Sequence, residues 1–474
     1  MAAPPSATAS QGDRASRSTW RRGRLFIYRR DPTSGPGRVG LQAFSPAIPH
    51  GGTLARWLYS WLLIGAVSYS LGMLAPLLIL QLGGNALEVG MANFAYYASS
   101  TIGSIFWGWM ADMVPRRKIF LTASSIVLAA APSAMALSRS VAGVVLWYAV
   151  GAFFYAALAV YLNLLVVETT DKGQWNENAR KGFLYLVTGS AVGTALGLVS
   201  ALGSELLGYA AASSAVGAAS ALLLYSSVGE PRIILERRAV LSSPNLFVSR
   251  LTSLPMIFLN FPRLFDVTLL RKRIRRIPGS ELSVLTLTNA LFSLSAQLFF
   301  TDYIPYEESV GLGEPQILLS FLYMTSINAL VAVTMADELR RPEYKLASRG
   351  MGLRALGMLA AAAFSTFVAG QDALYATMLS FTFIGFAYTI ITVTMNALLY
   401  ASLIPGTRGR SLGAYSTVGS LSFMTGALLS GFLAESLGYQ FVFFLSAVVL
   451  MAAAVVMELY YRSSGSTLDS IEVF

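Results

Sequence analysis

Tyrosine and asparagine occur at matching positions in the two halves of this sequence, inside apolar segments. Tyr155 and Asn163 return 233 residues later as Tyr388 and Asn396. A phenol and an amide can orient a solute by hydrogen bonds while the ring supplies apolar contact. Eight residues turn a helix by about 80°, so each pair shares a broad face. These residue types predict the binding of a small organic solute.

Two further amide side chains, Asn289 and Gln297, complete the set of candidate substrate-binding residues. Catalytic residues are scarce by comparison. The chain has no cysteine, and its one histidine, His50, lies in a polar N-terminal region. A cysteine nucleophile and a Cys/His metal site are therefore excluded. Because no paired carboxylates lie inside the apolar segments, we expect no enzymatic activity, no metal and no cofactor.

The apolar segments have the number and length of membrane spans. Hydrophobic residues make up 55% of the chain and charged residues 12%, about half the charged fraction of soluble proteins. Twelve segments reach the length of about 20 residues that crosses a bilayer. They are residues 57–82, 87–110, 119–137, 141–167, 182–203, 208–228, 282–306, 316–336, 351–370, 373–403, 411–434 and 439–461. Continuously apolar runs predict helices rather than a barrel.

One segment is written twice. Residues 180–209 and 410–439 share residue types at a constant offset of 230. The repeated residues are Arg180, Tyr185, Gly189, Ser190, Ser200, Glu205, Leu207, Gly208 and Tyr209. A doubled hydrophobic unit is typical of secondary transporters, which bind substrate near the midplane where the halves meet. We therefore predict an all-α polytopic membrane protein with twelve transmembrane helices in two six-helix repeats, residues 53–228 and 282–461.

Basic residues are confined to one side of these spans. With a cytoplasmic N-terminus, 33 of the 34 lysines and arginines fall in cytoplasmic segments, and Arg139 is the exception. The outer loops instead hold Glu88, Glu205, Asp302, Glu307, Glu308, Glu314, Asp372 and Glu435. This asymmetry is the positive-inside pattern, and it predicts a multi-pass cell-membrane protein with both termini in the cytoplasm. It also explains the net charge of +10 without a nucleic-acid partner.

With these span limits, no charged residue lies near the middle of the membrane. A charge there costs at least about 2.5–3.5 kcal/mol and usually signals function. An uncharged interior favours a neutral or weakly polar solute over a carboxylate, a phosphate or an inorganic ion. Aromatic faces could also hold an organic cation.

Three segments lie outside the spans. Residues 1–52 are rich in Ser, Pro, Gly and Arg, and we expect a disordered cytoplasmic tail, with a transit peptide as the alternative. Residues 229–281 form a cytoplasmic linker that is partly interfacial and ends in a basic cluster, which favours contact with anionic lipid of the inner leaflet. Residues 462–474 form a second cytoplasmic tail.

A charged motif joins the second and third spans. Residues 108–118 resemble the loop motif of the major facilitator superfamily, Gly-x-x-x-Asp-Arg/Lys-x-Gly-Arg/Lys-Arg/Lys. Gly108, Asp112, Arg116 and Arg117 match it, whereas Met113 and Pro115 depart from it. A weaker copy in the second half keeps its charges at Asp337, Arg340 and Arg341. The resemblance covers about residues 55–462.

The resemblance implies a cytoplasmic gate. In the family pattern, Asp112 faces the positive end of the eleventh helix, and Glu168 resembles the acid that extends this network toward Arg180. The candidate gate residues are Gly108, Asp112, Arg116, Arg117, Glu168, Arg180, Asp337 and Arg340. Charges at the end of a span that only set topology are the alternative reading.

These observations predict a monomeric secondary transporter that works by alternating access on a small neutral or amphipathic organic solute. Export of drug-like compounds is the first choice, and import of a sugar or other neutral nutrient is the alternative. A non-transporting receptor or scramblase is the alternative class. Drug–proton antiporters of the family often carry an arginine where Trp147 stands here, and a Gly-Pro pair that the fifth span lacks. Both departures speak against proton antiport by that machinery.

Overall fold

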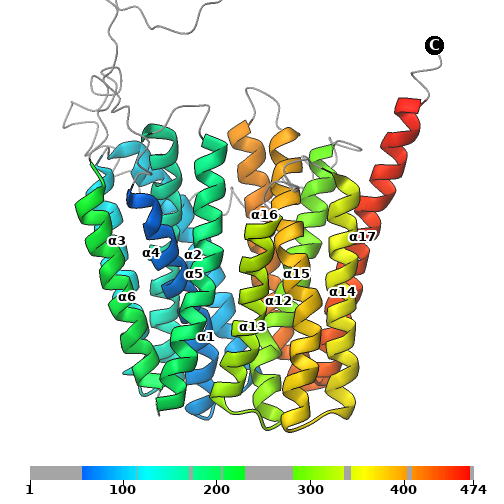
Figure 1. The fold of residues 1–474 in the computed structure, drawn as a ribbon, viewed down its shortest axis with the longest axis horizontal. Coiled ribbons are helices and arrows are strands. Elements are labelled where there is room, and N and C mark those ends of the chain that lie inside the picture. The colour runs from blue at the N-terminus through cyan, green and yellow to red at the C-terminus, as the bar shows by residue number, and fades with distance from the viewer. Residues whose placement is uncertain are drawn as a thin grey trace, which may run out of the picture. The chain divides into compact units, whose positions relative to one another are not determined.

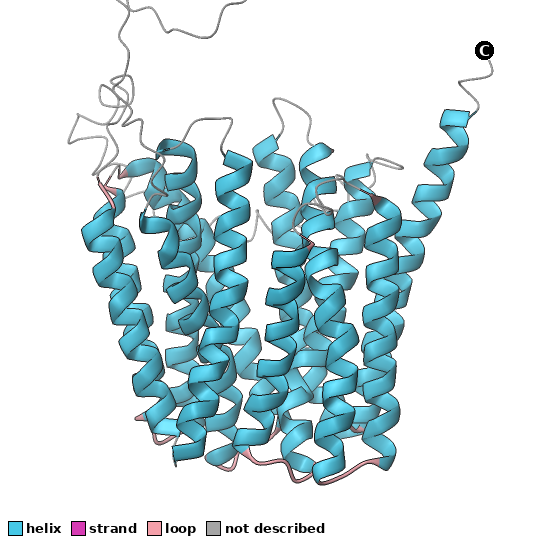
Figure 2. Ribbon diagram, in the orientation of Figure 1, coloured by secondary structure: helices cyan, strands magenta, loops and turns pink. Residues whose placement is uncertain are grey.

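The computed structural model describes residues 56–114, 116–169, 175–203, 206–229, 281–335, 343–402 and 408–469. These residues form twelve α-helices and one short 3-10 helix, and no strand occurs among them (Figure 2). The chain divides into residues 1–54 and a second unit that contains every described helix. The predicted tail 1–52 lies outside the described residues, as does the predicted linker except for Gly229 and Glu281.

The first half of the described chain contains six α-helices after the 3-10 helix Arg56–Tyr59. They are α1 (Ser60–Gln81), α2 (Ala86–Met113), α3 (Arg117–Ala136), α4 (Val141–Thr169), α5 (Trp175–Gly203) and α6 (Leu206–Ser227). The second half contains α12 (Glu281–Ser309), α13 (Glu314–Thr334), α14 (Tyr344–Phe367), α15 (Gln371–Ala401), α16 (Arg408–Leu437) and α17 (Tyr439–Asp469). The prediction of an all-α membrane protein with twelve long helices is confirmed.

Eleven of these helices are long and apolar enough to cross a membrane, and α2 is the one of the twelve that falls short. The middle of α2 carries Asn93, Tyr96 and Tyr97, which lower its hydropathy. All three side chains line a cavity inside the bundle. The polarity of α2 therefore faces the protein interior rather than lipid, as expected for polar groups at membrane depth.

The helices pack in the same pairs in both halves. In the first half α1 packs on α5, α2 on α4 and α3 on α6, and in the second α12 packs on α16, α13 on α15 and α14 on α17. The two halves meet where α2 packs on α16 and α5 on α13. This matched packing agrees with the repeat that the sequence indicates.

The two ends of the bundle differ in their connections. Helix α1 begins and α17 ends at the upper end in Figure 1, which we call the basic end because Arg117, Lys181 and Arg349 lie there. At the opposite end, the acidic end, four tight turns join α1 to α2, α12 to α13, α14 to α15 and α16 to α17. Each contains a glycine with positive φ, at positions 83, 311, 370 and 438, a conformation that costs glycine little.

Near the acidic end the backbones of α2 and α16 are in contact. A Cβ atom added at Gly90 would lie 2.8 Å from the Ala427 carbonyl oxygen, and one added at Gly431 would lie 2.6 Å from that of Ala86. No larger residue fits at either position without moving one helix. The two halves are therefore closely joined on this side of the bundle.

Two acidic residues predicted in outer loops are instead buried. Helix α12 continues through Pro305 to Ser309, so Asp302 and Glu307 lie on the helix, and both are fully buried. Asp302 accepts a hydrogen bond from the Ser430 hydroxyl of α16. The prediction was wrong for these two residues because it took acidic residues near the end of a span as loop residues. Glu308 is exposed.

Candidate substrate cavity

A cavity of about 530 Å³ lies inside the bundle, and residues of both halves line it. Helices α1, α2, α4 and α5 contribute from the first half, and α12, α13, α14, α15 and α16 from the second. Its volume is in the range of sites for small organic molecules. The cavity thus occupies the place between the halves where the sequence predicts the substrate site.

Aromatic side chains are the largest group of residues that line the cavity. Tyrosine and phenylalanine supply eleven of the 28 lining residues: Tyr69, Tyr96, Tyr97, Tyr148, Tyr155, Phe183, Phe292, Phe300, Phe321, Tyr388 and Phe423. The rings of Tyr97 and Phe423 stack across the two halves, with centroids 5.1 Å apart and planes 12° apart. Such a surface suits flat, apolar parts of a solute.

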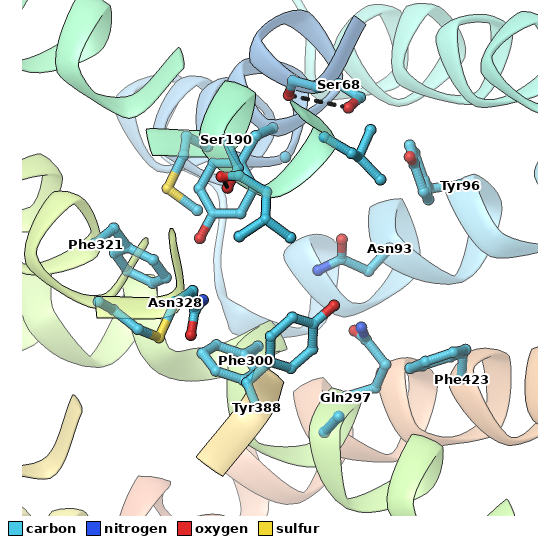
Figure 3. Close-up of a pocket in the computed structure, with 18 of the residues that line it drawn as sticks. Ser68, Asn93, Tyr96, Ser190, Gln297, Phe300, Phe321, Asn328, Tyr388 and Phe423 are labelled. Carbon is cyan, nitrogen blue, oxygen red and sulfur yellow. Dashed lines mark hydrogen bonds between the residues drawn. The ribbon is translucent and has the colours of Figure 1, made fainter. Parts of the chain in front are cut away.

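Amide and hydroxyl groups are interspersed with these rings. Gln297 donates a hydrogen bond from Nε2 to the Tyr97 hydroxyl, and Tyr148 donates to Asn93 Oδ1 at 3.2 Å. Asn328 lines the same space, and its Oδ1 has no hydrogen-bond partner in the described part of the chain. Figure 3 shows the polar ends of Asn93, Gln297 and Tyr388 directed toward one another across the cavity. The cavity can therefore hydrogen-bond a solute as well as cover it.

The structure brings three of the six predicted substrate-binding residues to the cavity, namely Tyr155, Gln297 and Tyr388. Asn289 is not among the lining residues, and its Nδ2 donates to the Tyr415 carbonyl oxygen at 3.3 Å, between α12 and α16.

Asn163 and Asn396 are both exposed and do not line the cavity. Asn163 donates to the Ala159 carbonyl oxygen of its own helix at 2.8 Å. Eight residues also carry a side chain about 12 Å along a helix axis, which takes both asparagines beyond the cavity toward the basic end. Of these four paired residues, only the two tyrosines line the cavity.

Arg354 also lines the cavity, although the sequence does not predict it as a substrate-binding residue. The predicted ninth span begins at residue 351, which places Arg354 at the membrane surface. In the structure α14 begins at Tyr344, so Arg354 lies ten residues inside the helix, about 15 Å from its start. Its side chain is 2% exposed. The expectation that no charge lies near the middle of the membrane is therefore wrong, and so is the uncharged cavity that it implied.

At the basic end, the described part of the predicted gate contains an ion pair between a buried arginine and a partly exposed glutamate. Arg117 is 4% exposed, and it bonds Glu168 twice, from Nη2 to Oε1 at 2.9 Å and from Nε to Oε2 at 3.2 Å. Arg117 Nη1 also donates to the carbonyl oxygens of Ala111 and Val114. The pair joins the start of α3 to the end of α4 and to the end of α2.

The structure describes only some of the other predicted gate residues. Arg116 is exposed at the residue before α3, and Gly108 lies in α2 with open space around it. Arg180 is half-buried near the start of α5. Asp337 and Arg340 lie outside the described residues, and so does the side chain of Asp112.

The sequence matches the family model of the Major Facilitator Superfamily over residues 57–402 and 340–470. The chain therefore belongs to the major facilitator superfamily, a family of membrane transporters. No curated protein matches it.

Solved transporter structures share the fold. A mutant of the nucleoside transporter NupG is similar with a TM-score of 0.64 and 13% identity, covering 86% of this chain and 99% of that one. A D-xylose–proton symporter is similar with a TM-score of 0.64 and 14% identity, covering 85% of this chain and 96% of that one. A POT family transporter in complex with a thioalcohol-conjugated peptide is similar with a TM-score of 0.63 and 12% identity, covering 86% of this chain and 96% of that one. At these identities the similarity concerns the fold alone.

Proposed function

We propose that this transporter carries a small organic solute by alternating access, and that the cavity lined by Tyr155, Gln297 and Tyr388 is its substrate site. The observation that carries the proposal is the composition of the cavity wall, to which both halves contribute. Contacts such as Tyr97 on Phe423 and Gln297 on Tyr97 cross between the halves. A solute bound there would touch both halves, so its binding would be coupled to their relative movement.

The aromatic wall favours an amphipathic solute with a flat apolar part, and we propose export of such compounds as the direction of transport. Import of a sugar is the second candidate, since Asn93, Gln297 and Asn328 could hydrogen-bond hydroxyl groups. The two candidates differ in substrate and direction, so one transport assay separates them.

We further propose that the Arg117–Glu168 pair belongs to a gate at the basic end, together with Gly108, Asp112, Arg116, Arg180, Asp337 and Arg340. The bidentate pair fixes the ends of three first-half helices relative to one another, and so supports the end of α2 that carries Asp112. Cysteine pairs placed across the ends of α2 and α16 at the basic end should crosslink less in Asp112→Asn than in the parent protein. Equal crosslinking would show that Asp112 has no part in closure.

We propose a monomer in the cell membrane. The distribution of charge supports an orientation with the basic end in the cytoplasm, near anionic lipid. The chain has no cysteine, so single cysteines can report this orientation. An impermeant maleimide should label intact cells at Glu308→Cys in the α12 end and spare Arg349→Cys in the α14 start. The opposite labelling would invert the topology.

Transport into proteoliposomes tests the proposed site. The assay compares an aromatic amphiphile with a hexose, with and without a pH gradient. Gln297→Ala should raise the half-saturating concentration about 5- to 150-fold, the effect of losing a hydrogen bond of about 1–3 kcal/mol to a buried partner. Asn163→Ala is the matched control, an exposed amide away from the cavity, and should leave transport unchanged. Weaker transport in Asn163→Ala, with no change in Gln297→Ala, would place the site nearer the basic end.

A further inference from the structure

Arg354 is the one charged residue among the described residues that line the cavity. It is also the single contribution of α14, and the equivalent first-half helix α3 contributes no lining residue. The arginine therefore reaches the cavity from a helix that otherwise packs on α15 and α17. A charge introduced into the cavity in this way needs an explanation, because a lipid-facing or packing role requires no charge.

Three aromatic rings surround the guanidinium group. Its Cζ atom lies 5.1 Å from the ring centroid of Phe292, 5.4 Å from Phe300 and 5.5 Å from Tyr388. Aromatic faces attract a cation, so they offset part of the cost of removing it from water. They accept none of its five N–H donors in the way an anion would.

Two nitrogen atoms of the Arg354 side chain have no hydrogen-bond partner among the described residues. These atoms are Nε and Nη1, and no carboxylate in the described part of the chain pairs with Arg354. The buried carboxylates of Asp302 and Glu307 lie on α12 toward the acidic end and outside the cavity lining. With no acidic residue among the lining residues, the cavity has an uncompensated positive charge in surroundings of low polarity, where charge acts strongly.

We propose that the cavity selects an organic anion, whose carboxylate binds the Arg354 guanidinium while its apolar part lies against the aromatic wall. This inference rests on the proposed function and specifies its substrate class. A planar guanidinium matches a carboxylate in shape and donor geometry, and hydrogen bonds between charged groups are stronger than neutral ones. The same positive charge disfavours an organic cation, although aromatic rings alone would have suited one.

A packing role for Arg354 is the competing explanation. In that case the arginine only joins α12, α14 and α15 through its ring contacts. The two explanations differ in the electrostatic potential that a solute meets, because the anion site requires the positive charge to act inside the cavity. A cysteine in the cavity can measure that potential without a known substrate.

The experiment places a single cysteine at Thr392, a cavity residue one turn beyond Tyr388 on α15. Its modification rate is measured in the purified full-length protein with two methanethiosulfonate reagents, one carrying a sulfonate and one a trimethylammonium group. The ratio of the anionic to the cationic rate should fall at least about tenfold when Arg354→Gln is added, since the reagents feel the charge with opposite sign. Arg349→Gln, an exposed arginine of the same helix, should leave the ratio unchanged.

A second readout uses ligands of matched shape. Naphthylacetate should protect the cysteine at concentrations about tenfold or more below those of naphthylacetamide, because only the anion gains charged hydrogen bonds. Naphthylethylamine should protect least. Arg354→Gln should abolish the preference, and Arg354→Lys, which keeps the charge, should retain part of it even if the glutamine variant folds poorly.

The outcomes separate the inference from the proposed function. Equal rate ratios in the parent and Arg354→Gln proteins, or protection by naphthylacetamide as good as by naphthylacetate, overturn the anion selectivity while a central solute site remains. A cysteine that neither reagent reaches would contradict an accessible central cavity, and with it the proposed function.

Discussion

Two arginines are buried in the described part of this protein, and their surroundings are opposite. Arg117 lies at the basic end, where Glu168 binds it at 2.9 Å and backbone carbonyl oxygens take further donors. Arg354 lies inside the bundle against three aromatic rings, with Nε and Nη1 unpaired in the described part of the chain. Both are less than 5% exposed, so burial alone does not distinguish their roles.

The difference lies in which molecule supplies the anion. The protein itself supplies a carboxylate to Arg117, so the charge of Arg117 is used within the fold to join α2, α3 and α4. Arg354 receives no carboxylate from the described part of the chain, so its positive charge remains available to a solute. The buried charge of Arg117 therefore stabilises the fold at the basic end, whereas that of Arg354 is available to bind a solute in the cavity.

The largest expected effect is the loss of the paired arginine. Arg117→Met should lower the free energy of unfolding by about 3 kcal/mol, because Glu168 and two carbonyl groups lose their buried partner. Unfolding of the purified protein in detergent, followed by tryptophan fluorescence, measures the change. Lys181→Met is the control. It removes the Lys181–Glu177 pair, 2.6 Å long and partly exposed, and should cost about 0.3–0.5 kcal/mol. Equal costs for both variants would remove the distinction drawn for Arg117.

A second prediction concerns access to Arg354. Gly431→Leu should disfavour the contact of α2 with α16 by about 1–3 kcal/mol, because the added side chain meets the Ala86 backbone. The population would shift toward a state that opens at the acidic end. A cysteine at Thr392 should then react faster with reagent added on that side of oriented proteoliposomes.

The same helix offers a matched control for this shift. A Cβ atom at Gly413 of α16 would meet no atom within 4 Å, so Gly413→Leu should leave the reaction rate unchanged. If both leucine variants behave alike, the contact at the acidic end does not control access to the cavity.

Removing Arg354 should change the free energy of unfolding in the opposite direction to removing Arg117. Arg354→Met should raise the free energy of unfolding by about 1 kcal/mol, since replacing a buried charge by an apolar side chain is often stabilising. Methionine can also keep favourable contacts with the surrounding rings. The same unfolding assay measures it. A loss of stability comparable to that of Arg117→Met would favour the packing role of Arg354.

Hydropathy and charge were enough to predict the helices, because each apolar segment is about one span long and the segments between them contain glycine or charged residues. They failed at Arg354 for a physical reason. The first turns of α14 contain Lys345 and Arg349, so the apolar segment starts about two turns after the helix does. Hydropathy detects contact with lipid, whereas the start of a helix depends on backbone hydrogen bonds.

The repeat located the cavity only in part. It showed that Tyr155 and Tyr388 are equivalent, and the structure brings both to the cavity. It could not show how far along the helices the cavity extends, so Asn163 and Asn396 were included although they are exposed. Arg354 could not be found from the repeat at all, because α3 brings no counterpart to the cavity.

The smallest expected effect separates the two equivalent tyrosines. Tyr388 contacts the guanidinium of Arg354 and Tyr155 does not figure among its ring partners in the described chain. A double-mutant cycle between Arg354→Met and Tyr388→Leu should give a coupling of about 0.5–1 kcal/mol in the unfolding assay, the size of one cation–π contact. The cycle with Tyr155→Leu should give a coupling near zero, although both tyrosines line the same cavity at equivalent positions. Equal coupling energies in the two cycles would mean that Arg354 acts on the whole cavity rather than through its ring contacts. The positive charge of Arg354 would then affect first-half residues as strongly as those of the second half.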